Sequence, residues 1–186
     1  TNVITVKASP IAVTVTATPS AVCQGGSSSL TTVGGYNDGV IISGALNTVN
    51  STTGYPAPLS NYYGGTKTQW MYTAAELTAL GFVSGDQITS LGLAVSAVGT
   101  TFTGTLNNFS IAMKNAGSLA ALTTTFETGL TSLGSLNWAV PTTGLPIWTY
   151  VTFATPFTWT GGNLVVETSY SNANSGTTTD FVQTYI

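Results

Sequence analysis

The chain of 186 residues has no histidine, no arginine and one cysteine, and only 5% of its residues are charged. Enzymes commonly need a titrating base, an activated nucleophile or a metal cluster, and histidine is the usual base near neutral pH. A Ser-His-Asp triad is therefore excluded, and neither a Gly-x-Ser-x-Gly nor a Gly-x-Gly-x-x-Gly motif occurs. We expect a protein that is not an enzyme.

The charge balance also limits the partners and the location. Three Lys+Arg against six Asp+Glu give a net charge of −3, so a cationic surface for phosphates is lacking and no nucleic-acid partner is expected. No run approaches the roughly 20 apolar residues of a membrane span, which predicts no membrane insertion. Cys23 is alone, so an internal disulfide is excluded and a small buried hydrophobe is expected. A surface hydrated by neutral hydroxyls and amides favours an extracellular location.

What the chain has in abundance is threonine, with 36 of 186 residues, together with 21 glycines. Threonine is β-branched and favours strands, and residues 11–17 alternate apolar and hydroxyl side chains with period two. So many strands separated by turns predict an all-β fold, a two-sheet antiparallel β-sandwich of jelly-roll or immunoglobulin-like type. Its four tryptophans are expected to serve core or sheet packing rather than to form a ligand platform. The expected strands are 11–17, 29–33, 67–72, 87–98, 108–114, 135–140, 148–153, 163–170 and 180–185.

One short helix is predicted near residues 74–80. Thr73 and Glu76 have the spacing of a capping box, in which the hydroxyl and the carboxylate each accept from a backbone N–H of the first turn. Gly81 supplies the left-handed residue after the last turn.

Two kinds of binding site can be derived from the residue types. Asp38, Asp86 and Asp180 lie in turn-like sequences whose oxygens suit Ca²⁺, although ordinary Asx turns are the favoured explanation. Asn37-Asp38-Gly39 predicts a tight turn. No other cofactor is expected. Tyr55, Tyr62 and Tyr63 occupy a Pro- and Gly-rich loop, where aromatic rings could stack on sugars.

Two stretches resemble modules of large secreted and surface proteins of the Bacteroidetes. The run from Val13 to Thr31 resembles the junction between consecutive immunoglobulin-like repeats, and residues 54–65, 70–81, 88–95 and 155–167 resemble a jelly-roll-like module of adhesins, including those of gliding motility. The resemblance implies export by the type IX secretion system and carries no catalytic residues. We expect residues 1–33 to end a preceding unit and residues 34–186 to form the sandwich.

These observations predict a non-catalytic structural or adhesive module of an extracellular multidomain surface protein or filament. Its expected partners are neighbouring modules or copies of itself. The alternative is a carbohydrate-binding module of a secreted protein, with surface glycans as its partners.

Overall fold

The computed structural model describes residues 2–7, 14–18, 29–33, 38–42, 58, 59, 61–172 and 181–184. In the four segments before residue 58 the description covers the strands and their pairing. Three residues singled out from the sequence, Cys23, Tyr55 and Asp180, lie outside the described residues.

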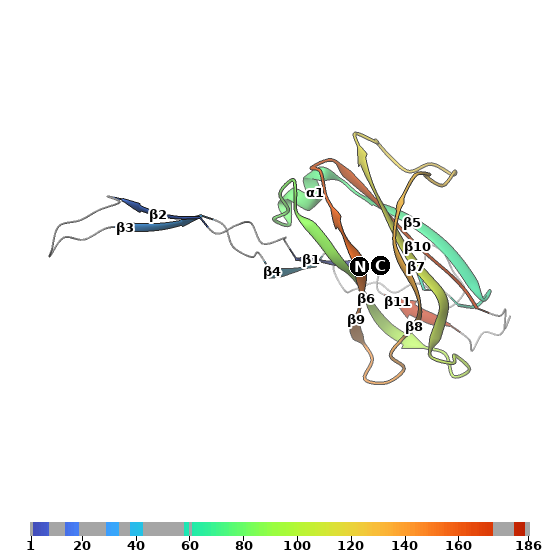
Figure 1. Cartoon of the computed structure of the whole chain (residues 1–186). Coiled ribbons are helices and arrows are strands. Elements are labelled where there is room, and N and C mark those ends of the chain that lie inside the picture. The colour runs from blue at the N-terminus through green and yellow to red at the C-terminus, as the bar shows by residue number, and fades with distance from the viewer. Residues whose placement is uncertain are drawn as a thin grey trace.

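The described strands form two packed antiparallel sheets and a separate ribbon (Figure 1). The first sheet contains β11 (Val182–Thr184), β6 (Gln87–Val98), β1 (Asn2–Lys7), β4 (Asp38–Ile42) and β9 (Ile147–Thr158). The second has the order β5 (Gly65–Tyr72), β10 (Asn163–Ser171), β7 (Thr105–Gly117) and β8 (Thr131–Ala139). The expected all-β, two-sheet antiparallel sandwich with one short helix is confirmed.

Strand β6 organises the first sheet, because both of its edges are occupied. β9 pairs with residues 87–95 of β6, while β1 pairs with residues 88–93 and β11 with residues 95–98. A strand has two edges, so β1 and β11 share the edge that β9 does not use. β4 pairs with β1 on its far side, which puts β9 and β4 at opposite margins of this sheet.

The core lies between the two sheets and is almost wholly apolar. Trp138 and Trp159 are buried, and Trp70 packs against the same cluster. Trp159 is 1% exposed, lies edge-on to Phe82 with ring centroids 5.8 Å apart, and donates its indole N–H to the Gly162 carbonyl at 2.7 Å. The aromatic rings therefore serve packing at these positions, as predicted.

Helix α1 (Ala74–Ala79) begins where the sequence places it. The Glu76 N–H donates to the Thr73 hydroxyl at 3.2 Å, and the Thr73 N–H donates to the Glu76 carboxylate at 2.8 Å. Gly81 follows with φ +95°. Leu77 is buried, and the Asn163 side chain accepts from the Ala74 N–H at 2.7 Å, so the helix start is attached to β10. The capping-box prediction is confirmed.

The largest difference from the sequence expectation is near the N-terminus. Strands β1 and β4 were not expected, and the predicted turn at Asp38 and Gly39 is wrong, because these residues begin β4 and pair with Lys7 and Val6. The pairing of β4 with β1, which itself pairs with β6, decides this conformation, and the local turn propensity of Asp-Gly could not predict it. Since β1 pairs with β6, the first unit and the sandwich share a sheet; the proposed boundary after residue 33 stays a prediction.

Of the described residues, no helix has the length and apolar character needed to cross a bilayer.

Candidate functional site

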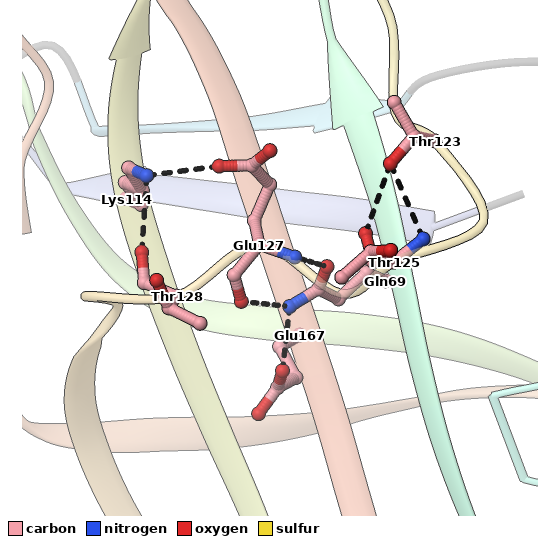
Figure 2. A network of polar contacts seen from close by, with 7 residues as sticks. All are labelled: Gln69, Lys114, Thr123, Thr125, Glu127, Thr128 and Glu167. Atoms are coloured by element: carbon pink, nitrogen blue, oxygen red, sulfur yellow. Dashed lines mark hydrogen bonds and ion pairs between the residues drawn. The ribbon is translucent and has the colours of Figure 1, made fainter.

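Polar and charged side chains gather on one face of the second sheet, under the loop that joins β7 to β8. Gln69 is on β5, Glu167 on β10 and Lys114 on β7, and the register places Gln69 beside Glu167. The loop adds Glu127 and Thr128 (Figure 2). We call Lys67, Gln69, Lys114, Glu127 and Glu167 the strap cluster.

Gln69 makes the central contacts of the strap cluster. Its side-chain oxygen accepts from the Glu127 N–H at 2.8 Å, and its side-chain nitrogen donates to the Glu127 carbonyl at 2.9 Å. The same nitrogen donates to the Glu167 carboxylate at 2.7 Å. One amide thus satisfies both backbone groups of a loop residue, as a neighbouring strand residue would in a ladder.

Two lysines complete the strap cluster. Lys114 lies 2.9 Å from the Glu127 carboxylate and donates to the Thr128 carbonyl at 3.0 Å. Lys67 lies 2.9 Å from the Glu167 carboxylate, and its ammonium is 5.1 Å from the centroid of the Phe126 ring. Both carboxylates therefore have a lysine partner, and both lysines also contact the loop.

An apolar residue of the second sheet, Val165, is buried on the face that points away from the core. Val165 is 0% exposed although it is not part of the core cluster between the sheets. In the register it pairs with Met71 on β5 and with Lys114 on β7, on the sheet face that carries Gln69 and Glu167. Val165 is thus a buried apolar residue on the sheet face that the strap cluster occupies.

The strap cluster contains four of the six charged side chains that the structure describes. These six are Lys67, Glu76, Asp86, Lys114, Glu127 and Glu167, and only Glu76 and Asp86 lie outside the cluster. Within the described ranges, no group of three or more His, Cys, Asp or Glu residues could hold a metal ion. Chemically, the arrangement is suited to fastening a loop.

The Asp86 side chain closes a turn with a backbone N–H three residues before it, whereas the side chain of an Asx turn bonds to the backbone two residues further on. Its carboxylate accepts from the Val83 N–H at 2.9 Å, and its own N–H donates to the Val83 carbonyl at 3.1 Å. Its carbonyl accepts from the Trp159 N–H at 2.9 Å, which ties this turn to the end of β9. The carboxylate thus has a structural hydrogen bond. Of the other calcium candidates, Asp38 starts β4.

The tyrosine loop brings together two of its three candidates. Tyr62 and Tyr63 meet edge to face, with ring centroids 4.6 Å apart and planes at 86°. Tyr63 is 54% exposed, whereas Tyr62 is only partly exposed. One ring is therefore presented to solvent and braced by the other.

An apolar hollow lies where the margins of the two sheets meet, between β8 and β9. Its volume is about 130 Å³. Ile111, Leu133, Val151 and Phe153 line it and are buried, whereas Leu136 at its rim is 41% exposed. A second, wider hollow of about 670 Å³ lies at one end of the sandwich and contains Thr100, Thr103, Thr105 and Thr142.

The chain matches no protein-family model, and comparison with curated proteins and with solved structures finds no significant similarity. Any assignment of function therefore depends on the residues of this chain.

The strap cluster could not be found from the sequence. Gln69 and Glu127 are 58 positions apart, and Gln69 and Glu167 are 98 positions apart. The only local signal was the scarcity of charge itself, which makes each remaining lysine and glutamate a candidate for a specific contact.

Proposed function

We propose that this chain is a non-catalytic structural or adhesive module of an extracellular multidomain surface protein or filament. The observation that carries the proposal is the strap cluster, in which Glu127 and Glu167 are each paired with a lysine and joined through Gln69. A catalytic acid or base has to contact its substrate, and these two carboxylates are committed to holding a loop.

Turnover assays test this proposal directly. The purified chain should show no turnover on broad panels of glycoside, ester and peptide substrates. Glu127→Gln and Glu167→Gln keep the side-chain shape and remove the charge, and they serve as matched variants. Turnover that survives further purification and disappears in either variant, with the fold intact by circular dichroism, contradicts the proposal.

The location is tested separately. Antibodies against the chain should label intact cells of the source organism as strongly as permeabilised cells. Labelling that requires permeabilisation contradicts an extracellular module, whatever the outcome of the turnover assays.

The second candidate function, a carbohydrate-binding module, is favoured by Tyr63, because an exposed aromatic ring held by a neighbour is the platform on which sugar rings stack. Glycan-array binding should then disappear in the Tyr62→Ala, Tyr63→Ala double variant. Phe126→Ala, which removes another exposed ring, is the control and should retain binding. Silence of the wild type across the array counts against this function and leaves the structural proposal in place.

A further inference from the structure

The outer edge of β9 has no ladder partner among the described strands. Among the described strands β9 pairs only with β6, and residues 147–152 do so in six consecutive register pairs without a shift. Ile147 is 39% exposed and Tyr150 is 43% exposed, so solvent reaches this margin of the sheet. The regular segment therefore presents unpaired backbone N–H and C=O groups on its outer side.

This edge lacks the usual protection against pairing. Proteins guard edge strands with charged side chains, especially lysine, with proline or with bulges. The sequence has no charged residue from 128 to 166. Pro146 and Pro156 flank the segment 147–152 without interrupting it, and the register shift of β9 falls beyond residue 152. A stretch of six residues is therefore open to another strand.

The hollow between β8 and β9 gives an added strand an apolar contact. About 130 Å³ is close to the roughly 150 Å³ of an apolar cavity that binds benzene, so it accommodates one aliphatic side chain. Val151 lies within the open segment and Phe153 follows it closely, so the hollow adjoins the open edge. Exposed Leu136 extends the apolar surface on β8.

The same chain carries a strand pair that has no third strand beside it among the described strands. β2 (Thr14–Thr18) and β3 (Ser29–Val33) pair with each other over five register positions and, among the described strands, with nothing else. Figure 1 shows this β2–β3 ribbon well away from the sandwich. An isolated two-stranded hairpin is marginal in water, so the ribbon needs a further partner. Its sequence fits an uncharged edge, because residues 8–37 contain no charge and Val13, Val15 and Ala17 alternate with threonine.

The chain enters and leaves the donor ribbon at the margin of the first sheet that lies opposite the acceptor edge. The chain leads into the β2–β3 ribbon from β1 and returns to β4, and both strands lie on the side of β6 away from β9. A ribbon that leaves from that margin is directed away from the β9 edge of its own chain (Figure 1). A second copy can instead receive it, and a contact between two different surfaces repeats from copy to copy.

We propose that the edge of β9 over residues 147–152 accepts strand β2 of a second copy of this chain, which joins copies head to tail by strand addition. The proposal rests on the proposed function as a structural module and names its partner. Backbone hydrogen bonds would supply the affinity, and an apolar side chain of β2 in the hollow would set the register.

The test uses the full chain and two variants that each disable one partner of the contact. Tyr150→Lys puts a charge on the acceptor edge, and Val15→Lys puts one in the donor strand. Tyr63→Lys is the matched control, since it makes the same substitution at another exposed tyrosine. Circular dichroism and denaturation midpoints establish that each variant is folded, and sedimentation velocity gives the size distribution over a range of concentrations.

The wild type and Tyr63→Lys should form chains that lengthen with concentration, while Tyr150→Lys and Val15→Lys should each remain monomeric. An equimolar mixture of these two variants should form dimers and nothing larger, because one intact donor then meets one intact acceptor. A monomeric wild type, assembly by either variant alone, or a mixture that stays monomeric overturns the proposal. None of these outcomes affects the turnover assays, so the two proposals fail independently.

Discussion

Replacing Gln69 by leucine should release the loop between β7 and β8, and the cost can be worked out from three contacts. Two are neutral hydrogen bonds to the Glu127 backbone, and one goes to the Glu167 carboxylate. At about 0.5–1.5 kcal/mol for each neutral bond and about 1.5–3 kcal/mol for the charged one, the sum is about 2.5–6 kcal/mol. Water reaches this half-buried site and replaces part of the loss, so we expect about 2–4 kcal/mol.

The comparison with Lys67→Met decides whether this reasoning is right. Lys67 makes an ion pair in which its own side chain is 47% exposed, and exposed pairs contribute about 0–1 kcal/mol. Salt screens exposed pairs, so the Lys67→Met effect should shrink in high salt, whereas the Gln69→Leu effect should persist.

Urea unfolding followed by tryptophan fluorescence gives both free energies, with Gln87→Leu as a control at another half-buried strand glutamine. Hydrogen exchange adds a local readout, because the Glu127 N–H should lose protection in Gln69→Leu. A Lys67→Met cost equal to or above that of Gln69→Leu, or an unchanged exchange rate at Glu127, would refute the hydrogen-bonded strap.

Three further changes test the rest of the fold. Trp159→Ala should cost about 3–5 kcal/mol in urea unfolding, since it empties a 1% exposed site and removes the bond to Gly162; a cost below that of a surface change would place this ring outside the core. Gly162→Ala should destabilise by about 1–3 kcal/mol, because its Cβ would lie 2.8 Å from the Gly117 Cα; an unchanged midpoint would contradict that close approach. Backbone and hydroxyl hydrogen bonds from Thr73 lower the pKa of Glu76 below 4.5, so its stabilising effect is present above that pH and is lost as the pH falls through the folded-state pKa. The stability difference between wild type and Glu76→Gln should therefore decrease on acidification, and a difference that grows would reverse the assignment.

Local patterns were sufficient for the strands and the helix of the sandwich. The alternation and the β-branched content predicted the strands from β5 to β10, with ends that differ by a few residues, because edge position and cross-strand pairing set where a strand stops. The capping box could be predicted fully, since Thr73, Glu76 and Gly81 interact within two turns of chain. Size and apolar surface predicted packing roles for the tryptophans, and Trp138 and Trp159 are buried, whereas Trp148 is half-buried and lies outside the core cluster.

Contacts between distant parts of the chain were decided only by the tertiary structure. Strands β1 and β4 exist as part of the first sheet because β6 offers an edge, and the sequence expectation of a turn at Asp38 could not include that pairing. The strap cluster joins residues 58 and 98 positions apart, and a sequence pattern carries no information on such a register. By itself the sequence determined the composition of the protein, which provides the side chains of an apolar β core and very few charges. The fold decided where those charges meet and which strand edges stay open, because hydrogen bonding between strands depends on their neighbours in space.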